Sequence, residues 1–296
     1  VLTADASAGN TTIVVDNNAL NTNNRFSAAL SQGDLIMIVQ TQGANIFGNS
    51  FPDGSGNFFG APKDSSWGEI LNYNNCGNYE LLEVAGVSGT NNIQLTCGLQ
   101  YNYSAAGKVQ IVRMPRCTNL TLNNAASIVC DAWNGAKGGI IAIEVDGATV
   151  IDGTVSATGR GFRGGVVDNQ SSFGSNDVAF TSPVFGAEKG ESIAGFQNDY
   201  NVVGGRYCKG APANGGGGGN MHNAGGGGGG NGGNPLNWIA VGNPSLAVAN
   251  WANGWNLEWP GLANATSSGG GKGGYTASTN NQNALIVGPN VGSWGG

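Results

Sequence analysis

Residues able to do acid–base chemistry are few and scattered in this sequence. The only histidine, His222, lies between two glycine runs, and its neighbours are asparagine and methionine rather than an acid that could orient a general base. Asp146 and Asp152 lie close to Glu144, but each precedes a glycine and is typical of a turn. A polysaccharide-cleaving pair needs two carboxylates at a defined separation. We therefore predict no catalytic residue and no enzyme, and keep a polysaccharide-degrading β-helix enzyme as one alternative.

The sequence gives only weak indications of a metal site, as it does of a catalytic site. Four oxygen-bearing residues have the spacing of positions 1, 3, 5 and 12 in an EF-hand loop: Asp53, Ser55, Asn57 and Asp64. Phe58 stands where that loop needs a glycine, and the flanking sequence indicates no helices. We predict no metal site and no cofactor. Binding of Ca²⁺ at other Asn/Asp turns is an open alternative, because the sequence does not indicate which turns would bind it.

The cysteines allow two interpretations. They are Cys76, Cys97, Cys117, Cys130 and Cys208. None forms a C-x-x-C pair, so a Cys/His zinc site is not expected. The thiols either act as small buried hydrophobes or form disulfides, and the pairs Cys76–Cys97 and Cys117–Cys130 each flank a strand-like segment. Cys208 would then be unpaired or would pair between chains.

Composition sets the class of protein. Of 296 residues, 54 are glycine and only 30 are charged (12 Lys+Arg and 18 Asp+Glu), against averages of about 7 % and about 25 %. The formal charge of −6 and the lack of a basic stripe exclude nucleic acid as a partner. No apolar run reaches the length of about 18 residues that a membrane span needs. The low charge and abundant Asn, Thr and Ser favour an extracellular or cell-surface location.

The few charged residues include one local cluster, from Glu188 to Glu191. We interpret it as a set of solvated ion pairs.

The rhythm of the sequence changes twice, which predicts three zones. Residues 1–116 carry short alternating strands between Gly/Asn turns, which favours a small antiparallel β-barrel or sandwich. Residues 117–160 carry still shorter strands of about four residues, which favours β-helix-like rungs stacked in parallel; a meander of Asp-Gly hairpins is the alternative. Residues 161–296 hold most of the glycine. The fold class is therefore all-β.

The glycine runs of the third zone are either a flexible linker or a lattice. Linkers usually mix glycine with serine, whereas these runs are nearly pure and lie among Asn residues and tryptophans. Polyglycine II rods, with three residues per turn, can pack laterally through backbone bonds because no side chain separates them. We favour three rods, Gly215–Gly219, Gly225–Gly230 and Gly269–Gly274, with Lys272 of the third pointing outward.

Aromatic residues border the glycine-rich parts and are the predicted contact residues. One group lies in a long glycine-rich insertion, and the other is spaced four residues apart: Phe58, Phe59 and Trp67, then Trp251, Trp255 and Trp259. Aromatic faces suit sugar rings, so these groups could form a glycan-stacking platform. The alternative for the tryptophans is a hydrophobic lid over the rods, since indole burial removes much apolar area from water.

Several motifs resemble a known kind of module. They are Gly186–Glu191 (GAEKGE), Gly210–Asn220 (GAPANGGGGGN), His222–Asn231 (HNAGGGGGGN) and Gly269–Tyr275 (GGGKGGY), behind a β-rich entry with GDLIMIVQTQGA and GNYELLEV. Together they resemble the glycine-rich module of large secreted surface and adhesion proteins of Bacteroidetes-type bacteria. Polyglycine packing is also similar to the glycine-rich receptor-binding tips of some phage tail fibres. The resemblance covers most of the chain, and it implies exposure, adhesion or assembly rather than a reaction.

These observations lead to one functional expectation and its alternatives. We expect an extracellular, non-enzymatic adhesin or surface-structure module whose partners are a glycan, a cell surface or copies of itself. A self-assembling filament or sheath subunit is the second hypothesis, besides the β-helix enzyme. We also expect the chain to belong to a larger chain or assembly.

Overall fold

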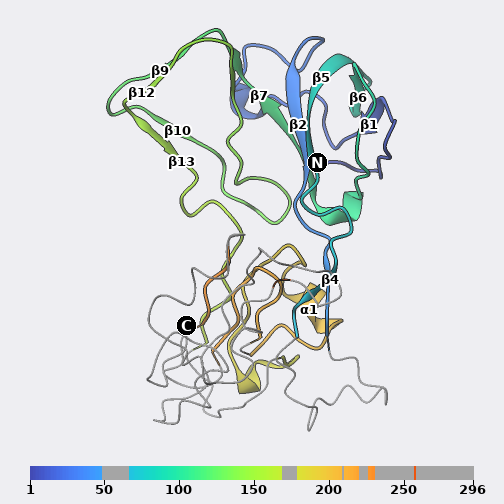
Figure 1. The fold of residues 1–296 in the computed structure, drawn as a ribbon, viewed down its shortest axis with the longest axis vertical. Coiled ribbons are helices and arrows are strands. Elements are labelled where there is room, and N and C mark those ends of the chain that lie inside the picture. Colours follow the sequence, from blue (N-terminus) through green and yellow to red (C-terminus); the bar gives the residue numbers. More distant parts are fainter. Residues whose placement is uncertain (49–66, 169–178, 209, 220–225, 231–256, 258–296) are drawn as a thin grey trace. The chain divides into compact units, whose positions relative to one another are not determined.

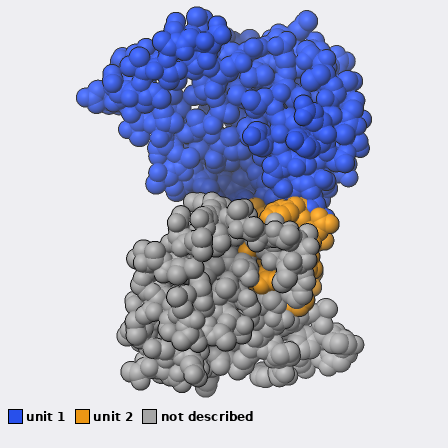
Figure 2. Space-filling model, viewed as in Figure 1, with its two compact units in different colours: residues 1–43, 74–162 blue, residues 44–73, 163–296 orange. Residues whose placement is uncertain are grey.

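The computed structural model describes residues 1–48, 67–168, 179–208, 210–219, 226–230 and 257. This part of the chain is predominantly β, with thirteen short strands, three 3₁₀ helices and one four-residue α-helix. It divides into two compact units (Figure 2). The first unit comprises Val1–Gly43 and Asn74–Phe162, and the second comprises Ala44–Tyr73 and Arg163–Gly296. The all-β class predicted from the sequence is confirmed.

A five-stranded antiparallel sheet forms the larger part of the first unit (Figure 1). Its strands, in spatial order, are β1 (Thr12–Val14), β6 (Asn92–Leu95), β5 (Tyr79–Ser88), β2 (Leu35–Gln40) and β7 (Val109–Met114). Short 3₁₀ helices, η1 (Thr22–Asn24) and η2 (Ala105–Gly107), lie in its connections.

This sheet is open, so of the two predicted forms, a barrel or a sandwich, the closed barrel is wrong. The N-terminal segment reaches both edge strands at one residue: Leu2 bridges Val15 and donates its N–H to the Val109 carbonyl at 3.0 Å. Closure needs a continuous ladder of hydrogen bonds between the edges. A single bridged residue does not supply one, so β1 and β7 are the edges of the sheet.

Strict alternation of side chains produces the core of this sheet. In β5, Glu80, Leu82 and Val84 are buried while the residues between them are exposed, as expected for side chains that point to opposite faces. Ile36 and Ile38 of β2 pack into the same apolar cluster. The buried carboxylate of Glu80 accepts hydrogen bonds from two backbone N–H groups and from the Tyr103 hydroxyl, and hence its burial is compensated.

Six short strands follow and pair in parallel. The pairs are β8 (Arg116–Cys117) with β11 (Glu144–Val145), β9 (Leu120–Leu122) with β12 (Thr149–Ile151), and β10 (Ser127–Val129) with β13 (Thr154–Ser156). Each residue pairs with one that lies 27 to 29 positions further along (154 − 127, 144 − 116 and 149 − 120). The chain therefore returns beside itself after about one coil, and does not form hairpins at its Asp-Gly turns.

The second unit contains little regular structure. Strand β3 (Asn45–Ile46) pairs antiparallel with β4 (Ile70–Asn72), and two short helices follow, η3 (Pro183–Phe185) and α1 (Asn198–Asn201). The long insertion of the first predicted zone thus belongs with the glycine-rich part of the chain. Among the described residues, no helix has the length and apolarity to cross a membrane.

Candidate functional site

Many of the predicted site residues lie outside the described part of the chain. These are Phe58, Phe59, Trp251, Trp255, Trp259, Gly225, Gly269 and Gly274, together with His222, Lys272 and the EF-hand-like group. Trp67, Gly215, Gly219, Gly230 and the cysteines are described. The best-defined arrangement around them is the packing of extended glycine-rich backbone in the second unit.

The segment 214–219 is hydrogen-bonded in three directions. Asn214 and Gly217 accept from the N–H groups of Gly230 (2.8 Å) and Gly227 (2.7 Å). Gly216 and Gly219 accept from Gly190 (2.8 Å) and Ala187 (2.7 Å). Gly218 instead donates to Cys208 (2.9 Å), in a third segment, while Gly215 closes a turn by donating to Pro212 (2.8 Å). Two of these directions are each used by residues three positions apart, and the third by Gly218 alone.

The neighbouring segment 187–191 repeats this pattern. Ala187 and Gly190 bond to the glycine segment just described, and Glu191 donates its N–H to the Arg163 carbonyl at 2.8 Å. Lys189 donates its N–H to the Arg206 carbonyl at 2.8 Å. A strand within a flat sheet has two neighbours, whereas this segment has three, at 163, 206–208 and 216–219. Extended backbone here packs as a bundle in three dimensions.

Close approach requires glycine in this bundle. A Cβ atom at Gly216 would lie 1.9 Å from the Gly227 carbonyl oxygen, and one at Gly218 would lie 2.0 Å from the Ala187 carbonyl oxygen. Neither residue has a left-handed φ, so space rather than backbone conformation excludes a side chain. Gly164, in the same unit, has no atom within 4 Å of such a Cβ.

Segment 187–191 contains a buried lysine. Lys189 is fully buried, and its Nζ donates to the carbonyls of Cys208 (2.8 Å) and Gly210 (2.7 Å). Nζ also lies 4.3 Å from the ring centroid of Trp67. The sequence predicts Trp67 as a contact residue, whereas the structure buries it at 1 % exposure, with Nε1 donating to the Val203 carbonyl at 2.6 Å. Trp67 is thus a core residue in this structure.

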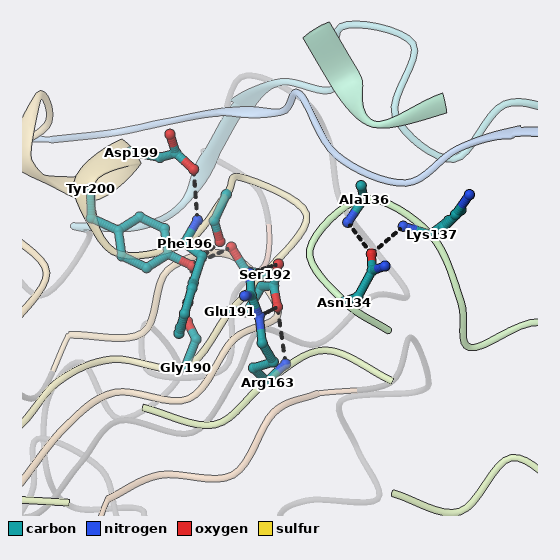
Figure 3. A network of polar contacts seen from close by, with 11 residues as sticks. Asn134, Ala136, Lys137, Arg163, Gly190, Glu191, Ser192, Phe196, Asp199 and Tyr200 are labelled. Atoms are coloured by element: carbon teal, nitrogen blue, oxygen red, sulfur yellow. Dashed lines mark hydrogen bonds and ion pairs between the residues drawn. The ribbon is translucent and has the colours of Figure 1, made fainter. Parts of the chain in front are cut away.

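Two buried carboxylates flank Lys189. Glu191 accepts from Arg163 through Nε (2.7 Å) and a terminal nitrogen (3.0 Å), and this interaction raises the pKa of Arg163 (Figure 3). Glu188 is paired with Arg206 Nε at 3.2 Å and accepts the Val166 N–H at 2.9 Å. The interpretation of Glu188–Glu191 as solvated ion pairs is therefore wrong: the three charged residues are buried. Their partners are far away in sequence, so local reasoning could not find them.

The Tyr200 hydroxyl closes one end of this network (Figure 3). It lies within hydrogen-bond distance of the carbonyl oxygens of Gly190 (2.9 Å) and Gly195, and of Ser192 Oγ (3.1 Å). Burial raises the pKa of Tyr200 above its ordinary value, which keeps the phenol protonated. The hydroxyl is therefore a structural donor that holds the turn after segment 187–191.

Of the acidic residues near the parallel strands, Glu144 is ion-paired, and Asp146 and Asp152 are held through their backbone. Glu144 forms an ion pair with Arg116 across β8 and β11. Asp146 and Asp152 lie at turns, where their N–H groups donate to Cys117 (3.0 Å) and Leu122 (2.8 Å) in the adjacent layer. Among the described residues, no group of three or more His, Cys, Asp or Glu side chains is placed to hold a metal ion.

None of the five cysteines forms a disulfide in this structure, so neither of the two possible pairs, Cys76–Cys97 and Cys117–Cys130, is bridged. Cys97 is exposed, whereas burial raises the pKa of the Cys76 thiol to about 12. Cys130 and Cys208 are buried.

An exposed apolar strip lies on the outer face of the five-stranded sheet. Tyr79 and Leu81 of β5 are 58 % and 55 % exposed. Their partners across the sheet are Val39 and Met37 of β2, which are half-buried. The strip thus presents an aromatic ring and apolar side chains together on one face of a sheet. The alternation of residues in the sequence did not identify it as a contact surface.

Comparison with known proteins identifies no family. No protein-family model matches the chain, and no curated protein matches it. Among solved structures, it is similar to the tailspike protein gp49 from Pseudomonas phage LKA1, with 17 % identity and a TM-score of 0.22. The match covers 52 % of this chain and 21 % of that chain, so this chain spans about a fifth of its length. A likeness at this TM-score defines neither fold nor function.

Proposed function

We propose that this chain is an extracellular, non-enzymatic surface-structure module of the adhesin type, in which a polyglycine II-like bundle and β-helix-like rungs form a rigid scaffold. The observation that carries the proposal is the three-directional hydrogen bonding of segments 187–191 and 214–219. A polyglycine II helix has three residues per turn and no internal hydrogen bonds, so successive residues bond outward to three different neighbours.

The rung part of the proposal rests on the parallel pairs of the first unit. Three pairs in a row keep a spacing of 27 to 29 residues, as successive coils of a solenoid do. The same spacing recurs at Trp133. Its backbone N–H donates to the Arg160 carbonyl (2.8 Å), and its ring packs against Phe162 with ring centroids 5.4 Å apart. All three pairs join residues 116–129 to residues 144–156, so the pairing observed is that of one coil with the next.

A rigid scaffold of this kind supplies shape rather than side-chain chemistry. Recognition would therefore fall to aromatic margins: the strip around Tyr79 and Leu81, and the predicted contact residues Phe58, Phe59, Trp251, Trp255 and Trp259. A glycan or cell-surface partner fits, because aromatic faces stack on the apolar faces of sugar rings.

A glycan array tests this proposal directly. We expect the intact chain to bind a subset of glycans, with binding lost in either Tyr79→Ala or Trp255→Ala and kept in Tyr101→Ala, an exposed tyrosine outside the strip. Circular dichroism would establish that each variant is folded. If the folded wild-type chain bound no glycan on a broad array, the adhesin function would be contradicted.

Self-assembly is a second candidate, favoured by one specific observation. Strands β10, β12 and β13 expose Val129, Val150, Ile151 and Val155 at 45 % to 50 %. Exposed apolar residues on short parallel strands are suited to stacking against further β-structure. Negative-stain images and light scattering of the purified chain would decide this: filaments support a sheath or filament subunit, and a monomer at high concentration opposes it.

A further inference from the structure

Among the described residues, the glycine segment Gly226–Gly230 is hydrogen-bonded along one of its three sides. Gly227 and Gly230 donate to Gly217 and Asn214. Among the described residues, Gly226, Gly228 and Gly229 form no backbone hydrogen bond with one another or with any other segment. These three glycines are exposed, and a Cβ at Gly228 would meet no atom within 4 Å.

Two sides of this segment therefore present backbone N–H and C=O groups with no side chain in front of them. With three residues per turn, residues 227 and 230 share one side, residues 226 and 229 the second, and residue 228 lies on the third. A side-chain-free row of unpaired backbone groups is a template for another extended strand. The strand that fits must itself be glycine at each inward position, because Gly216 and Gly218 show how closely such segments pack.

We propose that the side of this segment carrying Gly228 is the docking site of the chain's own glycine run 269–274, which thereby adds a further rod to the bundle. This inference rests on the polyglycine II-like scaffold proposed above and deepens it. The run 269–274 lies outside the described residues, so the argument depends on its sequence and its tether.

The sequence of the run suits a rod with two side-chain-free sides. At three residues per turn, Lys272 shares a side with Gly269, while Gly270 shares a side with Gly273, and Gly271 with Gly274. The single lysine therefore takes up one side, which the proposed docking would leave toward solvent. Either of the other two sides can approach the backbone at Gly228.

The tether brings the run within reach. Leu257 is buried, and its carbonyl accepts the Ile70 N–H at 2.7 Å. Two residues before Ile70, the Gly68 carbonyl accepts the Ala213 N–H (2.7 Å), and the next residue, Asn214, accepts from Gly230. Gly269 follows Leu257 by 12 residues (269 − 257), which reach up to about 40 Å when extended. The anchor is thus close to the docking side in the same unit.

Tethering also decides between this occupant and a second copy of the chain. A stable interface between molecules needs about 800 Å² per partner, and three exposed glycines offer a small part of that. A tethered segment has a high effective concentration and needs no such area.

Hydrogen exchange resolved to single amides in the intact chain tests the proposal. We expect the amide of Gly228 to exchange about 100-fold more slowly than in an unstructured peptide, since its hydrogen bond must open first. Gly273→Ala and Gly270→Ala, made singly, place a Cβ on one candidate side, and Gly271→Ala and Gly274→Ala on the other. The two variants of whichever side contacts Gly228 should reduce that protection at least about tenfold. Lys272→Ala is the matched control and should leave the protection unchanged.

A thermal-unfolding comparison adds a second readout. Gly228→Ala has open space in the described structure, so it should match Gly164→Ala if nothing docks there; we expect it to lower the melting temperature clearly more than Gly164→Ala does. Rapid exchange at Gly228 with continued protection of Gly227 and Gly230 would overturn the docking and leave the scaffold standing. Rapid exchange at all three would overturn the scaffold itself. Protection of Gly228 that depends on protein concentration would overturn the in-chain occupant in favour of a second copy.

Discussion

The ammonium group of Lys189 lies 4.3 Å from the ring centroid of Trp67, and both side chains are at most 1 % exposed. A buried charge is costly unless it is paired and hydrogen-bonded. Here the backbone supplies much of the compensation, because the carbonyls of Cys208 and Gly210 accept from Nζ. The glycine-rich bundle has few side chains of its own, so carbonyl dipoles and one indole face substitute for the water that Lys189 gives up.

Replacing Lys189 should therefore destabilise the second unit. Lys189→Met keeps most of the stem and removes the charge, which leaves two buried carbonyls without their donor. We expect a loss of about 3 kcal/mol in the free energy of unfolding, measured by urea denaturation. The exposed Lys137 provides the control: Lys137→Met should cost less than about 0.5 kcal/mol. Equal losses of unfolding free energy in the two variants would show that the buried hydrogen bonds of Lys189 do not stabilise the fold.

Glycine at position 216 should be needed for space. Gly216→Ala drives a Cβ to 1.9 Å from the Gly227 oxygen, so two backbone segments must separate. We expect destabilisation of about 2 kcal/mol or more, as for other over-packed interiors. Differential scanning calorimetry of the intact chain would measure it.

The control is Gly164→Ala in the same unit, where nothing lies within 4 Å and φ is not left-handed. That change should be neutral or slightly stabilising, since alanine reduces the entropy of the unfolded chain. If Gly216→Ala were as harmless as Gly164→Ala, segment 214–219 would behave as a linker.

The strands were the part of the fold most open to prediction. The alternation in Leu35–Gln40 and Tyr79–Ser88 identifies strands whose one face is buried, because a period of two has no other common origin. Short segments around Asp146-Gly147 likewise predicted strands, and the structure pairs these strands in parallel. Whether the sheet closes was not predictable, since closure depends on the pairing of β1 with β7, which are about 100 residues apart in the sequence.

The site was less accessible to sequence reasoning. The pattern GAEKGE looks solvated, because three charges in four residues are usually exposed; only the distant partners Arg163, Arg206 and Trp67 make their burial tolerable. For the glycine runs, composition favoured lateral packing but could not tell which residues face which neighbour. That follows from hydrogen bonds between segments separated by up to 32 residues (219 − 187).

Acid should weaken the first unit through Asp34. Burial alone would raise the pKa of Asp34, but bonds from the Ser31 N–H (2.7 Å) and the Arg113 guanidinium (2.9 Å) outweigh it, so the pKa is lowered. A carboxylate with a folded-state pKa below its unfolded value of about 3.9 stabilises the fold above that pH. This stability is lost as the pH falls through the folded-state value.

Asp34→Asn should remove that dependence. The variant should be less stable at pH 7 by about 1 kcal/mol, and the difference from wild type should shrink as the pH drops below about 4. Urea denaturation from pH 7 to pH 2 would measure both effects. A difference that stays constant over this range would exclude Asp34 as a source of the acid sensitivity.

Thiol reactivity should differ sharply between Cys97 and Cys76. Cys97 is exposed, whereas burial raises the pKa of Cys76 to about 12, so about one Cys76 in ten thousand is a thiolate at pH 8. Iodoacetamide at pH 8 should therefore alkylate Cys97 first and leave Cys76 unmodified until the chain is unfolded, as read by peptide mass spectrometry. The same measurement decides the Cys76–Cys97 disulfide that the sequence leaves open, because such a bridge would protect both residues even in denaturant and release both on reduction. Modification of Cys97 in the native, unreduced protein is the outcome that the structure requires.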